Sequence, residues 1–455
     1  MHPALQIVEV VEMVCAQVGH RKAPCDLARL ARTSTLFLNP ALNVLWRHQG
    51  TLVHLLRCMP EDLWEITETR PYDDEPTIIE LTISLRRPIT FADWERFLFY
   101  SRRVKSFSLE EQGSLESFEV YETLNSSFPE TYIFPNLQKL DWHPIPPESC
   151  PYVRPFLSPH ITKVGIAIED SSYFNILSTV AQKCPRLTDF SIGTAFVPDT
   201  ASIPAISRFV CTQRHLESLV AIGLDHTALT HIARLPGLRY LWLMSDTRPI
   251  PILPFRPPAG HPHFPALSNL KIETMELAPV LLAFLAKCSL VGFKIVARGR
   301  TKLYTKMHQT SLFSFGNLVT LSLSHAVGFD LDDEVAQDMA HAWPRIEMLW
   351  LPSGPSYRMT PRVTLKGVHA FAERCPHLRV LNMTFDATVV PKIGTENNVS
   401  QPSLAGLNVG YSPIGKPRSV AEFLAATFPL FRVVASHKGW KKVEEALLDF
   451  PGFPY

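Results

Sequence analysis

A short pattern of apolar positions recurs along most of the chain. It consists of an apolar residue, two others, an apolar residue, one other, and a third apolar residue. Fourteen segments follow the pattern, beginning at Ile78, Val104, Leu137, Ile161, Leu187, Leu216, Leu238, Leu267, Leu290, Leu318, Ile346, Leu378, Leu404 and Phe431. Their spacing averages about 27 residues, which lies within the 20 to 29 residues typical of leucine-rich repeats.

Each unit of this period combines a strand with a helix. The second and third apolar positions alternate with other residues, as a short strand with one buried face requires. Helical spacing precedes many of the patterns, for example in YFNILSTVAQKC, SIPAISRFVC and TLKGVHAFAERC. One strand and one helix cannot bury both faces alone, so neighbouring units must stack. The sequence therefore predicts an α/β fold, with a leucine-rich-repeat solenoid over residues 78–455 that carries proline-rich insertions.

Two of the eight cysteines occupy a position that recurs shortly before the apolar pattern. Two residues separate it from the first apolar position, and a proline nearly always follows it. We call it the apolar slot; it holds Phe134, Cys184, Leu235, Phe264, Trp343 and Cys375. Because cysteine replaces Phe, Leu and Trp here, we interpret both thiols as small buried hydrophobes and not as metal ligands. The proline ends the helix and starts the extended strand.

Three short helices are predicted before the repeats. The first has an apolar stripe formed by Ile7, Val10, Val11, Val14 and Val18. The second begins at Asp26, a suitable N-cap, and places Leu27 and Leu30 on one face. The third begins with Asn39 as cap and Pro40 at the first helical position, and Gly50 ends it. Its stripe is Leu42, Leu45 and Trp46.

These helices resemble an F-box. The resemblance rests on HPALQIVEVVEMV, DLARLARTS and NPALNVLWRH, and the following TLVHLLRCMPEDLW looks like the helix after the F-box in many fungal F-box proteins. It covers about residues 2–64. Val8 stands where the family usually has a proline, and Leu36 with Phe37 where it has a tryptophan. The expected organisation is an F-box-like module over 1–50, a linker helix and connection over 51–77, and the repeat array.

The resemblance implies a non-catalytic receptor subunit of an SCF-type ubiquitin ligase. Its F-box would dock on a Skp-type adaptor and through it on a cullin, while the repeats would bind a target protein, without any cofactor. The residues expected to bind or support the adaptor are Leu5, Ile7, Val10, Val11, Val14, Leu27, Leu30, Leu36, Phe37, Leu45 and Trp46. Of these, the stripe Ile7, Val10, Val11 and Val14 with Leu45 and Trp46 is expected to be partly exposed in the isolated chain.

Two alternatives stay open at this point. The helices could form a plain cap that closes the end of a solenoid, since such caps are also amphipathic. The chain could also be a leucine-rich-repeat interaction scaffold without any connection to ubiquitin, an alternative motivated by Val8, Leu36 and Phe37.

Composition narrows the partners and the compartment. The chain of 455 residues has a formal net charge of +1, which gives no electrostatic case for a nucleic acid or an anionic membrane. No apolar stretch is long enough to span a bilayer, and the first residues lack the basic start of a secretory signal. The cysteines form no CxxC pair, which fits the reducing cytoplasm or nucleus.

Few residues or motifs in the sequence suggest catalysis or metal binding. The sequence contains no HExxH, GxSxG or Walker motif, and no cysteine stands in a basic setting, so nothing motivates an enzyme. His261 and His263 lie in a proline-rich stretch, and we assign no metal to them. The acidic cluster DLDDE at residues 330–334 is interpreted as the cap of a following helix.

Two repeats place large side chains at outward strand positions. Most units have small or polar residues there, such as Ser191, Lys271, Ser322, Asn382 and Asn408. The exceptions are Tyr240 with Trp242 and Met348 with Trp350, which we interpret as target-binding anchors. Four strand spacings put the tryptophans about 20 Å apart, a span that suits a protein target. Alternatively, the insertion from Thr247 to Pro265 folds over Trp242.

Overall fold

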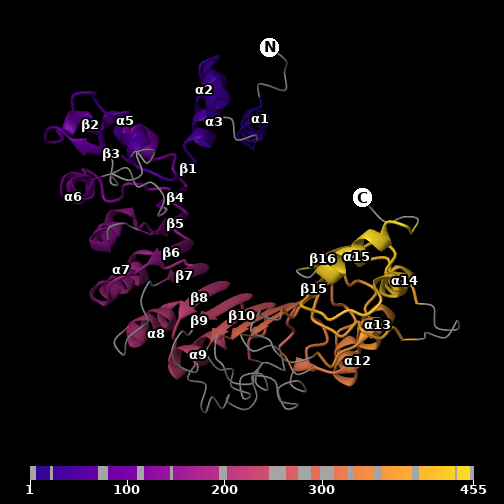
Figure 1. The fold of residues 1–455 in the computed structure, drawn as a ribbon. Coiled ribbons are helices and arrows are strands. Elements are labelled where there is room, and N and C mark those ends of the chain that lie inside the picture. Colours follow the sequence, from indigo (N-terminus) through magenta and orange to yellow (C-terminus); the bar gives the residue numbers. More distant parts are fainter. Residues whose placement is uncertain are drawn as a thin grey trace. The chain divides into compact units, whose positions relative to one another are not determined.

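The computed structural model describes the chain in two compact units, Met1–Leu216 and Glu217–Tyr455. The described residues are 7–20, 24–69, 80–109, 117–143, 147–193, 202–244, 263–274, 288–297, 312–325, 329, 331–352, 361–391, 399–435 and 438–450. Within each unit, strands lie side by side in chain order with helices along one side of them (Figure 1). Among these residues, no helix is long and apolar enough to cross a membrane.

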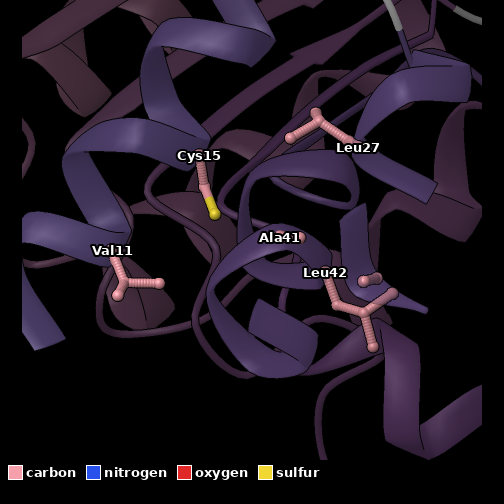
Figure 2. Packing of buried hydrophobic residues seen from close by; sticks show 6 residues of the cluster. Val11, Cys15, Leu27, Ala41 and Leu42 are labelled. Carbon is pink, nitrogen blue, oxygen red and sulfur yellow. The ribbon is translucent and has the colours of Figure 1, made fainter. Parts of the chain in front are cut away.

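The first unit opens with three packed helices, α1 (Val8–His20), α2 (Pro24–Ala31) and α3 (Thr35–Leu45). Both α1 and α2 contact α3. They share a small core of side chains at most 9% exposed, which consists of Val11, Cys15, Leu27, Ala31, Ala41 and Leu42. Figure 2 shows how the labelled members of this core gather between the helices.

Two of the helix starts differ from the prediction. Asp26 is not the N-cap of α2, because the helix begins at Pro24 and Asp26 lies in its first turn. The start of α3 at Pro40 is also wrong: Ser34 caps this helix, its hydroxyl oxygen accepting from the Leu36 N–H at 3.3 Å. Pro40 lies inside α3, where it lacks the N–H for one helical hydrogen bond.

The earlier start of α3 has a reason in packing. Leu36 and Phe37 are partly buried against the core of the three helices. A helix that began at Asn39 would lose the turn that holds both side chains there. The apolar contacts and the Ser34 cap together outweigh the hydrogen bond that the proline cannot make.

Parallel strands follow in the order β1 (His48–Gln49), β4 (Ser106–Leu109), β5 (Lys139–Trp142), β6 (Lys163–Ala167) and β7 (Asp189–Gly193). The connections between them contain α5 (Trp94–Ser101), α6 (Phe118–Ser127), η3 (Pro147–Phe156), η4 (Ser171–Asn175) and α7 (Ile176–Lys183); α8 (Ser202–Thr212) follows β7. Aromatic side chains fill the core beneath these strands; Phe107, Trp142 and Phe156 are within 6.4 Å of one another by ring centroids.

The first predicted repeat strand, beginning at Ile78, is wrong. Residues 78 and 79 lie outside the described residues, and β3 (Glu80–Leu85) pairs antiparallel with β2 (Trp64–Thr69) in a separate sheet. The parallel order begins instead at β1, within the segment assigned to the helical module. The residues between β1 and β4 also contain α4 (Val53–Leu56) and η2 (Phe91–Asp93). A strand with one buried face has the same apolar spacing in either sheet, so the pattern alone does not distinguish them.

The second unit continues the alternation with parallel strands β8 (Ser218–Ile222), β9 (Tyr240–Met244), β10 (Asn269–Thr274), β11 (Gly292–Ala297), β12 (Thr320–His325), β13 (Met348–Trp350), β14 (Val380–Asn382), β15 (Gly406–Gly410) and β16 (Arg432–Ala435). Its described helices are α9 (His226–Ile232), α12 (Asp333–Ala342), α13 (Leu365–Arg374), α14 (Pro417–Thr427) and α15 (Lys438–Leu447). For the patterns that begin at Val104 through Leu404, each strand starts two residues after the first apolar position of its pattern. The predicted mixed α/β stack of parallel strands and helices is confirmed.

The apolar slot is confirmed as well. All six of its named residues are at most 5% exposed, and Cys184 and Cys375 are fully buried. Burial raises the pKa of each thiol to about 12. The acidic cluster caps α12 as predicted, with the Asp332 carboxylate accepting from the Val335 N–H at 3.0 Å; Asp330 lies outside the described residues. In the described part of the chain, no three His, Cys, Asp or Glu side chains are placed to hold a metal.

Candidate interaction surfaces

Several apolar side chains at helix α1 are exposed. Ile7, just ahead of the helix, and Val8, Met13 and Val14 within it are between 39% and 61% exposed, and Leu38 of α3 is 39% exposed. We call Ile7, Val8, Met13 and Val14 the α1 patch. An apolar group of this kind, held by a helix that has its own packed core, is typical of a protein interface.

The predicted adaptor residues differ widely in burial. The expected exposure of Val11 is wrong, because this side chain is fully buried and belongs to the three-helix core, as Leu27 also does. Partial burial against that core is found for Leu30, Leu36, Phe37, Leu45 and Trp46. Ile7 and Val14 are exposed and Val10 is half-buried, while Leu5 lies outside the described residues. Val11 and Leu27 therefore hold the helices together and offer no contact surface.

Sequence reasoning missed Val8, Met13 and Leu38 as exposed apolar residues. The signal was present in the helical spacing. Neither Val8 nor Met13 belongs to the predicted stripe. Met13 lies on the side of α1 away from the buried Val11 and Cys15. Val8 shares their face but is exposed at the start of the helix. Apolar residues on the polar face of a short helix are the ones to examine for a docking function.

Helix α3 is joined to the first repeats by two contacts. Trp46, which follows α3, stacks on Tyr100 of α5 with ring centroids 4.5 Å apart. The Arg103 guanidinium donates to the side-chain oxygen of Asn39 at 2.9 Å and to that of Asn43. Asn39, which the sequence assigned to capping, is thus a link between the helical module and the repeats.

In the second unit, the strand register aligns the two predicted tryptophans. Trp242 of β9 pairs with Lys271 of β10, which pairs with Lys294 of β11. Lys294 pairs with Ser322 of β12, and Ser322 pairs with Trp350 of β13. Trp242 and Trp350 are therefore the ends of one row of outward-facing side chains, which we call the tryptophan row. Four strand spacings correspond to about 20 Å.

The two ends of the tryptophan row differ in accessibility. Trp350 is 37% exposed and Met348 39% exposed, whereas Trp242 and Tyr240 are half-buried. The Lys271 ammonium lies 3.2 Å from the Trp242 ring centroid and forms an ion pair with Glu273 at 2.7 Å. Most of the predicted insertion from Thr247 to Pro265 lies outside the described residues. Trp350 is thus the more accessible of the two predicted anchors.

The tryptophan row also contains a positively charged side chain, Lys294, between its two aromatic ends. Lys294 is exposed and makes no ion pair among the described residues. In the first unit, two lysines at the first position of their strands are neutralised, because Lys139 pairs with Asp141 at 2.6 Å and Lys163 with Asp189 at 3.2 Å. The outward surface of the second unit therefore combines accessible aromatic area with an unpaired cation.

Fold and surfaces together define an α/β repeat protein with an amino-terminal helical module. No protein-family model matches the chain, and no curated protein matches it. One solved structure that matches, described as the crystal structure of Rad7 and Elc1 complex in yeast, has 14% sequence identity and a TM-score of 0.40, covering 75% of this chain and 80% of that chain. At these values, neither a family nor a partner transfers from that complex to this chain.

Proposed function

We propose that this chain is the substrate-recognition subunit of an SCF-type ubiquitin ligase, with no catalytic activity of its own. The observation that carries the proposal is the coincidence of the F-box-like sequence with a three-helix module that has its own core and an exposed α1 patch. The module precedes an array of parallel strands and helices, a scaffold suited to holding a protein target.

In this role, the α1 patch docks on a Skp-type adaptor, which connects the chain to a cullin. The repeats hold a target protein near the ubiquitin-charged enzyme, so the contribution of the chain is a raised effective concentration of target lysines. This assignment places the protein in the cytoplasm or the nucleus, where such ligases work.

The proposed target site is the tryptophan row with Tyr240 and Met348 beside it. Trp and Tyr contribute strongly to interfaces because they bury a large area at a low cost in conformational entropy. A row about 20 Å long exceeds the size of a small-molecule contact and suits a protein surface or an extended segment. Lys294 adds a preference for a carboxylate of the target between the two aromatic contacts.

The decisive experiment is co-expression of the full chain with a Skp-type adaptor, followed by size-exclusion chromatography. A stable one-to-one complex supports the proposal. Absence of a complex at micromolar concentrations of both proteins overturns it and favours the interaction scaffold without a connection to ubiquitin. That second function is favoured by one sequence observation, the replacement of the usual family residues by Val8, Leu36 and Phe37.

A further inference from the structure

A polar cavity in the first unit shares only one of its lining residues, Met13, with the α1 patch. Its volume is about 800 Å³, and it lies between α1, α3 and the segments that lead into β4, β5 and β6. Four basic side chains line it, Arg47, Arg102, Arg103 and Lys105. The volume is within the range of small-molecule sites, but the walls are too polar for an apolar ligand.

The backbone holds two of these cations side by side. The Lys105 N–H donates to the Arg47 carbonyl oxygen at 2.9 Å, and the Gln138 N–H donates to the Lys105 carbonyl oxygen at 2.8 Å. Arg47, Lys105 and Gln138 therefore occupy equivalent positions just ahead of β1, β4 and β5. Arg47 and Lys105 are both exposed, and neither makes an ion pair among the described residues.

Arg103 is a third cation without a carboxylate partner. Its guanidinium donates to the neutral side chains of Asn39 and Asn43 and lies 4.6 Å from the Phe99 ring centroid. Its Nε is buried without a hydrogen-bond partner, and burial lowers its pKa. Neutral partners do not offset the cost of burying a positive charge as an anion does.

The charges at the cavity do not cancel internally. Arg102 is neutralised by Glu130, with a distance of 2.6 Å between the charged atoms. Glu9 and Glu12 of α1 also line the cavity, but both are exposed and neither pairs with Arg47, Arg103 or Lys105. The lining therefore has three cations without an ion-pair partner among the described residues and two solvated carboxylates; two of the cations, Arg47 and Lys105, are neighbours through their backbone.

We infer that this cavity binds a small multivalent anion through phosphate or carboxylate oxygens, with Arg47, Arg103 and Lys105 as its ligands. Arg103 is already oriented by Asn39 and Asn43, so its donors need little ordering when an anion binds. Guanidinium and ammonium groups form charge-assisted hydrogen bonds to such oxygens. Because the ligand would contact side chains next to both α3 and β4, binding would also stabilise the attachment of the helical module.

The test is calorimetric titration of the full chain, at low ionic strength, with tripolyphosphate in one arm and citrate in the other. The two arms distinguish phosphate from carboxylate as the preferred group. The main variant carries Arg47→Ala and Lys105→Ala, because both side chains are exposed and unpaired and their removal leaves the fold intact. We expect each lost charge-assisted contact to weaken binding by about tenfold.

Arg96→Ala is the matched control, since Arg96 is an exposed arginine of α5 that does not line this cavity. Its affinity should equal that of the parent chain. Arg103→Gln is measured in parallel, and its folding is checked by circular dichroism. If that variant fails to fold, the double variant still decides the question.

Two results would overturn the inference. One is the absence of binding by both anions at millimolar concentrations; the other is an unchanged affinity in the double variant. A glutamate-rich peptide serves as a third ligand, and binding of this peptide without binding of either small anion would also reject the small-anion assignment.

Discussion

Trp46 stacks on Tyr100 at 4.5 Å between ring centroids, with 24° between the ring planes, and this contact joins the end of α3 to α5. We expect Trp46→Ala to loosen the three-helix module from the repeats, because both packed area and the aromatic pair are lost. The expected cost is about 2 kcal/mol. Hydrogen exchange of α1 to α3 measures it, and Trp350→Ala, which removes an exposed tryptophan, is the control. Equal protection in both variants would contradict the prediction.

Val14→Asp should abolish or strongly weaken adaptor binding while leaving the chain folded. Val14 is 39% exposed, so the carboxylate is solvated in the free chain but unpaired and buried in the complex. That difference costs several kcal/mol on binding. The measurement is the dissociation constant of the complex with a Skp-type adaptor. Val389→Asp makes the same change at an exposed position of the second unit and should bind normally.

Val11→Ala tests whether Val11 belongs to the three-helix core and not to the adaptor interface. Val11 is fully buried in the three-helix core, so the substitution removes packed methyl groups and should destabilise the module by about 2 kcal/mol. Its effect on the adaptor should follow the lost stability and should disappear at low temperature, where the module is folded. If Val11→Ala leaves the stability of the module unchanged but weakens adaptor binding, Val11 lies at the interface and its assignment to the core is wrong.

Trp350→Ala should reduce capture of the target protein without changing adaptor binding. Target and adaptor are recovered together by affinity purification of the full chain and quantified separately. Trp242→Ala should have a smaller effect, because Trp242 is half-buried and its ring is already covered by the Lys271 ammonium. Loss of both partners together, or of neither, would mean that these side chains have structural roles alone.

The buried and the exposed cysteines should differ clearly in their reactivity toward thiol reagents. Burial raises the pKa of Cys184 and Cys375 to about 12, so at pH 7 these thiols are protonated as well as covered. Cys25 is exposed. A chromogenic disulfide reagent should label Cys25 rapidly in the native chain and should label Cys184 and Cys375 only after denaturation, as peptide mapping would show. Rapid native labelling of Cys375 would contradict its place in the core.

Local spacing accounts for the parts of the fold that the sequence predicted well. From Val104 onward, each strand follows its pattern because alternating burial is a property of neighbouring residues in one extended segment. Cys184 and Cys375 were assigned to the core for a similar reason, since chemically unrelated side chains exchange at one recurring position. In these regions the neighbours along the chain carry most of the information.

The sequence by itself determined the period of the array, its strands after Val104 and the apolar slot. Only the tertiary structure decided that β3 pairs with β2, that Val11 faces inward, and that Arg47 meets Lys105 across 58 residues of chain. Each of these depends on which distant segment supplies the partner. An apolar side chain is equally apolar in a core or on a docking surface, and a basic side chain acquires a site only when the fold brings others beside it.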